Sequence, residues 1–145
     1  MPIGDDSNRF TGSYNGNGFS IEGLTINQTS GEEDSGLFGY SSGSLTRIDL
    51  INASVNGQYR VGALVGKNKG LINQSSADGQ VSGISHVGGL VGYHATPGAI
   101  NQSSSIAEVQ GSTSWIGGLV GNFNSGSVRN SYATGKVTGG DSVGG

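Results

Sequence analysis

A repeat of about 27 residues runs through the sequence and constrains its fold more than any other feature. The pattern is a small residue, a leucine, a hydrophobic residue and a glycine, and it occurs at Gly36–Gly39, Ala63–Gly66, Gly89–Gly92 and Gly118–Gly121. The intervals between its leucines are 27, 26 and 29 residues. Repeats of this length are typical of solenoid proteins, in which each repeat packs only against its neighbours. We therefore expect one stack of similar rungs.

Two further hydrophobic columns keep the same phase and indicate strands. They are Leu45, Ile72, Ile100 and Val128, and Val55, Val81, Val109 and Val137. Short segments rich in Val, Ile and Leu that are separated by Gly, Asn and Ser are typical of β-strands joined by tight turns. No stretch has the 3.6-residue period of an amphipathic helix. The sequence predicts an all-β solenoid with three short strands per rung and essentially no helix; in the third rung the strands are Val87–Gly92, Ala99–Ser103 and Ala107–Gly111.

The composition excludes several classes of protein. Charged residues make up only 12 % of the chain, whereas a disordered chain of such low hydrophobicity is usually highly charged. The 7 basic residues are scattered, so the basic stripe of a nucleic-acid-binding protein is missing. No apolar run approaches the roughly 20 residues of a membrane-spanning helix. The absence of cysteine excludes disulfides and thiolate metal sites. We expect neither nucleic-acid binding nor membrane insertion.

The chain is expected to form a single domain, residues 1–145, of about 4–5 rungs. Residues 1–34 lack the repeat pattern and alternate in strand fashion around the Asn15–Gly18 turn, so we expect an atypical N-terminal cap or first rung. Residues 35–145 hold the repeats, and Val143–Gly145 begins a further copy. We expect this last repeat to be truncated, with the open strand edge continued in a longer array or covered. The N-terminus has no signal-peptide pattern, so an export signal would lie upstream or have been removed.

Several segments resemble the GLUG repeat of large bacterial surface proteins. Val87–Gly92, Ile100–Ser103 and Tyr132–Gly139 carry the resemblance. This repeat is found in filamentous-haemagglutinin-like adhesins and in the non-catalytic regions of IgA-specific metallopeptidases. The resemblance implies a right-handed parallel β-helix, an extracellular or cell-surface location and no catalytic residues. The chain departs from the pattern at Ala63, which replaces a glycine, and before Gly36, where the preceding Val-Gly is missing.

The acidic residues and histidines do not form a recognisable catalytic or metal site. Polysaccharide-cleaving β-helices need carboxylates stacked on one face, but Asp49, Asp78, Glu108 and Asp141 occupy different phases of the repeat. A weak Ca²⁺ site at residues 32–34 is the alternative to a solvated loop. His86 and His94 have no third ligand in phase, so we expect surface residues rather than metal ligands. The sequence predicts no enzyme and no cofactor.

The Asn-x-Ser/Thr sequence, which is the acceptor for N-glycosylation, occurs at Asn27, Asn52, Asn73 and Asn101. Asn73 and Asn101 share one phase of the repeat, and we expect them to form a stacked amide ladder or a turn.

Two columns of large polar and aromatic residues flank the repeat pattern and are the candidate binding site. One column precedes each Val-Gly or Ile-Gly pair and holds Arg60, His86 and Trp115; the other follows each repeat pattern and holds Tyr40, Lys67, Tyr93 and Asn122. Aromatic rings stack on sugars, and basic groups pair with acidic ones. We therefore expect a ridge that binds glycan or a host or cell-surface protein, with Tyr40, Arg60, Lys67, His86, Tyr93 and Trp115 as the candidate residues.

Three functions fit this architecture. The first is a non-catalytic adhesin or structural module of a bacterial cell surface. The second is a fibre element that associates end to end through its last rung. The third is an ice-binding solenoid, which needs a regular threonine column, but the threonines share no common phase.

Overall fold

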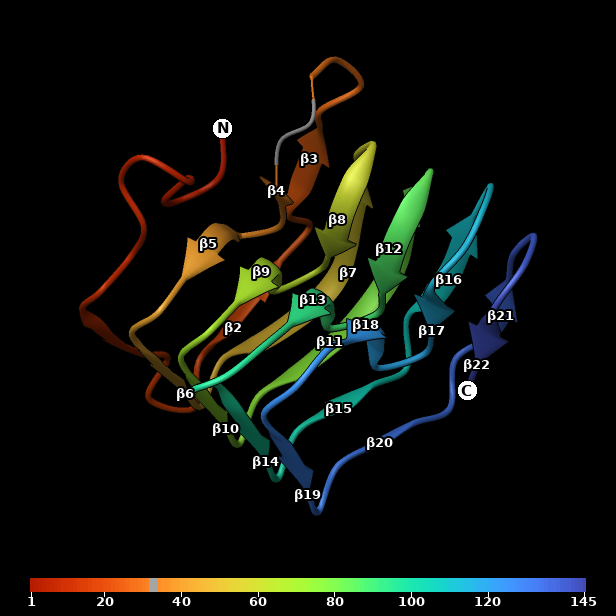
Figure 1. The fold of residues 1–145 in the computed structure, drawn as a ribbon. Coiled ribbons are helices and arrows are strands. Elements are labelled where there is room, and N and C mark those ends of the chain that lie inside the picture. The colour runs from red at the N-terminus through yellow and green to blue at the C-terminus, as the bar shows by residue number, and fades with distance from the viewer. Residues whose placement is uncertain (32–33) are drawn as a thin grey trace.

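The computed structural model describes residues 1–31 and 34–145, which wind into a β-solenoid of about five turns (Figure 1). All of its strand pairs are parallel, and the described residues form no helix. No helix in this part of the chain is therefore able to cross a membrane. The predicted all-β solenoid is confirmed.

Each turn of the chain passes through four parallel sheets, which we name A to D in chain order. Sheet A contains β5 (Phe38–Ser41), β9 (Val65–Asn68), β13 (Val91–His94) and β18 (Val120–Phe123). Sheet B contains β1 (Ser13–Asn15), β6 (Ser44–Thr46), β10 (Leu71–Asn73), β14 (Ala99–Asn101) and β19 (Ser127–Arg129).

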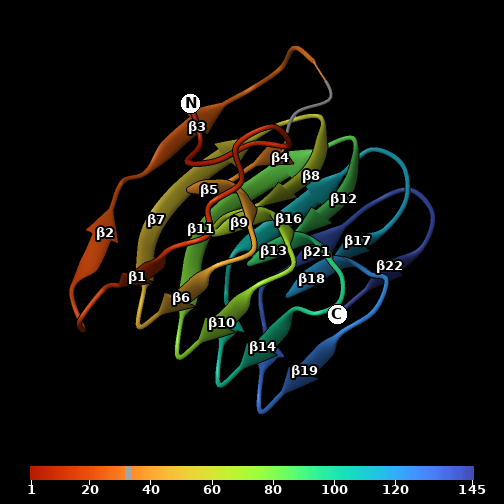
Figure 2. The same cartoon turned by 60° about the vertical axis from the view of Figure 1, so that its left-hand side comes forward.

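Sheets C and D complete each turn. Sheet C contains β2 (Ser20–Glu22), β3 (Thr25–Asn27), β7 (Asp49–Asn56), β11 (Ser76–Gly83), β15 (Ser104–Ser105), β16 (Glu108–Gly111), β20 (Tyr132–Ala133) and β21 (Val137–Thr138). Sheet D contains β4 (Asp34–Ser35), β8 (Tyr59–Gly62), β12 (Ser85–Gly88), β17 (Ile116–Gly117) and β22 (Val143–Gly144). Figure 2 shows the rungs stacked in chain order, from the red N-terminal segment to the blue C-terminal one.

A rung has strands in four sheets rather than the three strands predicted, because the repeat pattern itself bends. The segment Val87–Gly92 is divided between β12 in sheet D and β13 in sheet A, with the bend at residues 89–90. A Cβ on Gly88 would overlap the carbonyl oxygen of Val91, so the chain needs a glycine where it leaves sheet D. The bend also breaks the alternation of the strand, and Val87, Leu90 and Val91 are all completely buried.

The strand registers align the predicted hydrophobic columns, whose members are buried except in the last rung, where Val128 is 37 % exposed and Val137 is partly buried. Leu45, Ile72, Ile100 and Val128 stand opposite one another through sheet B, and Val55, Val81, Val109 and Val137 do so through sheet C. Like residues therefore stack on like residues, and each rung extends the core of the previous one. The alignment of these two columns, predicted from the sequence, is confirmed.

Polar ladders hold the corner between sheets B and C. The backbone N–H of Ser75 donates to Ser103 Oγ at 3.2 Å, and that of Ser103 donates to Ser131 Oγ at 3.1 Å. Asn101 Nδ2 donates to Asn73 Oδ1 at 3.1 Å, which confirms the predicted amide ladder. These bonds satisfy polar groups that the corner would otherwise bury without partners.

Residues 1–31 pair with the first repeat and cover the interior at that end. Ile3 and Phe10 form isolated parallel bridges to Phe38 and Ser41 of β5. The ring centroid of Phe10 lies 4.9 Å from that of Phe38, and Tyr14 lies 5.8 Å from it. The aromatic residues of the N-terminal segment thus close one end of the hydrophobic core.

Candidate ligand-binding face

A column of outward-facing side chains arises from a recurring irregularity of sheet D. Arg60, His86, Trp115 and Ser142 have φ angles of 49°, 54°, 60° and 55°, which side chains rarely adopt. The register of sheet D pairs Ser85 with Tyr59 and Val87 with Val61 and passes over the residue between them. One residue is skipped on each strand, so this is a left-handed kink that recurs in successive rungs and changes the direction of that residue's side chain. We call these four residues the bulge column.

A second column lies on the neighbouring sheet A. Lys67 stands opposite Tyr40 on one side and Tyr93 on the other, and Tyr93 stands opposite Asn122. The short bend between sheets D and A brings this column beside the bulge column. The predicted alignment of both columns is confirmed.

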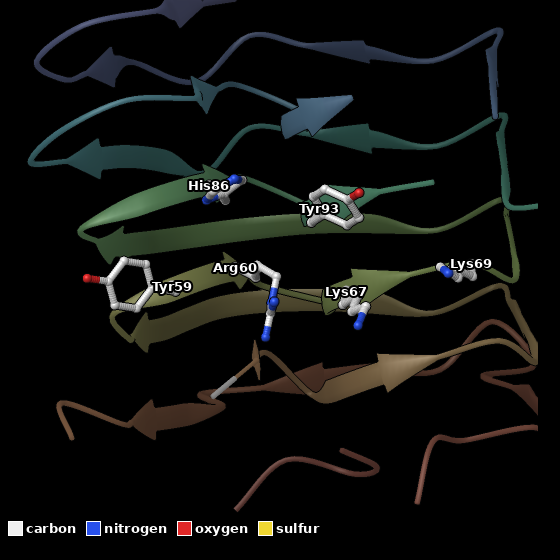
Figure 3. Close-up of a pocket in the computed structure, with 6 residues that line it drawn as sticks. All are labelled: Tyr59, Arg60, Lys67, Lys69, His86 and Tyr93. Carbon is white, nitrogen blue, oxygen red and sulfur yellow. The ribbon is translucent and has the colours of Figure 1, made fainter. Parts of the chain in front are cut away.

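A groove of about 410 Å³ opens between two successive rungs on this face (Figure 3). Arg60 and Lys67 belong to one rung, and His86 and Tyr93 belong to the next (Figure 3). The side chains that line it are those of Tyr59, Arg60, Lys67, Lys69, His86 and Tyr93. We call it the basic–aromatic groove.

Two carboxylates border this groove on its N-terminal side. Lys67 Nζ lies 2.7 Å from Asp6 Oδ1, and Arg60 Nη2 lies 3.6 Å from Asp6 Oδ2. The hydrogen bond from Lys67 lowers the pKa of Asp6. Arg60 Nε also forms an ion pair with Asp34. The N-terminal segment therefore reaches across one rung to the cations of the groove.

Asp34 is buried, which corrects the prediction of a solvated loop at this position. Its exposed fraction is 6 %. Burial raises its pKa to about 6, against the opposing effect of Arg60. Glu32 and Glu33, the other members of the weak Ca²⁺ site considered from the sequence, lie outside the described residues.

Aromatic rings continue the groove toward the C-terminal rungs. The imidazole of His86 stacks on the indole of Trp115, with centroids 4.6 Å apart and planes at 27°. Its centroid lies 6.1 Å from that of Tyr93 in an edge contact. Burial, and then the charge of Arg60, lower the pKa of His86, so its ring is neutral at neutral pH. The rung after Trp115 offers only the small Ser142 at this position, and the indole is 47 % exposed.

Four of the six predicted site residues line the groove: Arg60, Lys67, His86 and Tyr93. Trp115 stacks at its end. Tyr40 is only 5 % exposed and lies under Lys67, whose Nζ is 4.4 Å from the ring centroid. It therefore supports Lys67 and offers no open face to a ligand, contrary to the prediction.

The sequence interpretation missed Tyr59 and Lys69 as groove residues. Lys69 follows Lys67 by two residues, and alternate residues of an extended chain share one side. The two-residue spacing from Lys67 could therefore have predicted that Lys69 lies on the same side. Tyr59 precedes the kink at Arg60, and nothing in the sequence pattern shows that both side chains reach the same hollow.

The two histidines differ in their surroundings, and the prediction that both lie at the surface is wrong for His94. Its side chain is completely buried, Nδ1 lies 3.1 Å from Asn68 Nδ2, and its ring stacks on Phe123 at 5.7 Å. Burial lowers its pKa. His94 directly follows the outward-facing Tyr93 in β13, and successive residues of a strand point to opposite faces, so its side chain enters the interior. Within the described ranges, no group of three or more His, Cys, Asp or Glu could hold a metal ion.

Asp49, Asp78 and Glu108 stand on sheet C, away from the groove. Asp49 accepts a hydrogen bond from the hydroxyl of Ser76, and Glu108 Oε1 lies 3.8 Å from Lys136 Nζ. Asp49 and Asp78 line a second hollow of about 330 Å³. Asp49 stands in register with Ser76, while Asp78 falls in the irregularity of β11, so the two side chains occupy different phases of the rung.

The model of the GLUG motif family matches residues 112–138. This segment is therefore similar to the GLUG repeat. It contains Trp115, which belongs to the bulge column. It also contains Asn122, which stands opposite Tyr93 in the column on sheet A. The resemblance noted in the sequence is confirmed.

Two relatives share part of this chain. Halomucin of Haloquadratum walsbyi is 42 % identical over 90 residues, which are 61 % of this chain and 1 % of halomucin. A putative Gly-rich membrane protein of Evansella cellulosilytica is 43 % identical over 86 residues, which are 53 % of this chain and 9 % of the relative. The chain thus spans only a small part of either relative. No solved structure matches it.

Proposed function

We propose that this chain is a non-catalytic repeat module of an extracellular surface protein, and that its basic–aromatic groove and Trp115 bind carbohydrate. The stack of His86 on the exposed indole of Trp115, beside a groove of polar side chains, is the observation that carries the proposal.

The GLUG repeat and the relatives support the surface location. One relative is named as a halomucin and the other as a putative Gly-rich membrane protein, which are both names of surface-type proteins. A solenoid of parallel rungs is also a common way to extend a binding surface along a large protein.

The chemistry of the face supports carbohydrate as the ligand. The apolar face of a sugar ring stacks on an aromatic ring, and its hydroxyls need hydrogen-bond partners close by. Trp115 offers the ring, while Tyr59, Tyr93 and Lys69 offer polar groups along the groove. Rungs spaced by about 4.8 Å repeat this arrangement along one line, as an extended polymer requires.

A protein partner and ice are less well matched to the same face. Lysine is depleted in protein interfaces, whereas two of the six residues lining this groove are lysines. An ice-binding face needs threonines in register. In the described strand pairs, Thr46 stands opposite Asn15 and Asn73, Thr25 opposite Ser54, and Thr138 opposite Gln110.

A glycan array with matched variants tests the proposal. Trp115→Ala removes the stacking ring and should weaken binding of a captured oligosaccharide by about tenfold. Tyr132→Ala is the control, because Tyr132 is 61 % exposed on sheet C and lies away from the groove. Equal binding by the wild type and Trp115→Ala, or loss of binding in Tyr132→Ala alone, would place the ligand elsewhere and refute the proposal.

A further inference from the structure

Building on the proposed carbohydrate binding, we propose that the basic–aromatic groove selects acidic saccharides, and that Lys69 with Lys67 and Arg60 holds the carboxylate of a uronic acid residue.

The groove concentrates positive charge on an acidic chain. Three of the 7 basic residues line it, although the net charge of the chain is −3. Among the described residues that line it there is no carboxylate. The electrostatic field inside such a hollow favours an anionic ligand over a neutral one of the same shape.

An internal carboxylate already occupies the N-terminal rim of this cluster. Asp6 lies 2.7 Å from Lys67 Nζ and 3.6 Å from Arg60 Nη2, although its side chain is 59 % exposed. These two cations are therefore placed so that one carboxylate bridges them. Asp34 compensates Arg60 from the buried side.

Lys69 is the groove cation without a direct ion pair among the described residues, although its charge helps to lower the pKa of Asp6. Its side chain is half-buried on the same rung as Lys67 (Figure 3). Among the described residues, two carboxylates face three cations, so these five groups together carry one net positive charge. An ammonium group bound to a carboxylate forms a stronger hydrogen bond than two neutral partners do.

The aromatic part of the face fits the same ligand. A uronic acid carries its carboxylate on the rim of a sugar ring whose flat side is free to stack. The His86–Trp115 stack lies one and two rungs from Lys69, so neighbouring sugars of one oligomer reach the cations and the indole together. The proposal therefore adds the charge of the ligand to the stacking already inferred.

The test compares each acid with its own neutral ester. Hexamers of galacturonic acid and of mannuronic acid, and their methyl esters, are titrated into the intact chain by calorimetry. At least one acid should bind about tenfold more tightly than its ester, because the ester lacks the charge. Lys69→Met should remove this difference, while Lys136→Met, which removes an exposed cation from sheet C, should preserve it.

Asp6→Asn provides a gain-of-binding variant that does not depend on damaging the groove. Asp6 competes for Lys67 and Arg60, so its removal should tighten binding of the acid several-fold and leave binding of the ester unchanged. Circular dichroism of each variant checks that the β-solenoid is retained.

The outcomes separate this inference from the function on which it rests. If acid and ester bind equally, or if Lys69→Met preserves the preference for the acid, the groove does not select charge and the inference is wrong, while carbohydrate binding stands. If neither uronate binds but a neutral glycan binds in a Trp115-dependent way, the inference again fails alone. If no glycan binds, both proposals fail.

Discussion

Asp34 shows how burial can outweigh an ion pair at a single residue. The carboxylate contacts Arg60, yet loss of hydration raises its pKa from 3.8 to about 6. A carboxyl group whose pKa is higher in the folded state binds its proton more tightly there than in the unfolded chain. The contribution of Asp34 to stability therefore falls as pH rises from about 4 to about 6. Buried ion pairs are often neutral or unfavourable for this reason.

We predict that the free energy of unfolding of the wild type, compared with that of Asp34→Asn, is higher at about pH 5 than at about pH 7. The change in the difference between their free energies of unfolding should be about 1 kcal/mol. Urea unfolding at the two pH values measures it, with the exposed Asp141→Asn as the control. A difference that does not change with pH would show that Asp34 has an ordinary pKa.

At the scale of the element, two series of residues with positive φ shape the rung. One is the bulge column of sheet D, and the other comprises Arg47, Gln74, Gln102 and Asn130 at the corner between sheets B and C. Both series repeat at one position per rung, so the geometry of the turn imposes the conformation and the side chain varies freely. In the bulge column, three of these variable positions hold large side chains, Arg60, His86 and Trp115, which lie on the face with the groove.

We predict that Gln102 tolerates glycine but not valine. Its φ is 47° and its side chain is exposed, so substitution changes the backbone preference more than any contact. Gln102→Val should lower the free energy of unfolding by more than about 1 kcal/mol, because a β-branched residue fits this conformation poorly. Gln102→Gly should stay within about 0.5 kcal/mol of the wild type, because relief of strain offsets the added chain entropy. Chemical denaturation compares them. Equal stability of the two variants would contradict the role assigned to this conformation.

The repeat period was enough to predict the stack and the columns, because residues at one phase must meet when rungs pair in register. Arg60 with His86, and Lys67 with Tyr93, were predictable in this way. The depth of a side chain was not predictable, because it depends on where the chain bends. It also depends on what covers the side chain: Tyr40 is buried beneath Lys67, and the bend at residues 89–90 divides one predicted strand between two sheets.

Viewed as a whole, the molecule is a stack in which no single rung contains the groove. Residues 59–69 supply one wall and residues 86–93 the next, and only the parallel register brings them together. The GLUG segment at residues 112–138 extends the same face by one rung through Trp115. We therefore expect binding to be a property of the stacked face formed by sheets A and D, with sheets B and C serving as scaffold.

NMR mapping of a bound oligosaccharide is the best test of whether the face formed by sheets A and D binds the ligand. The ¹⁵N-labelled chain is titrated with hexagalacturonate and, separately, with hexamannuronate, and the backbone amide shifts are followed. We expect the chemical-shift changes to be confined to the face formed by sheets A and D. They should be largest around Arg60, Lys67, Lys69, His86 and Trp115. Changes centred on the second hollow of sheet C, near Asp49 and Asp78, or no changes at any residue with either hexamer, would contradict this expectation.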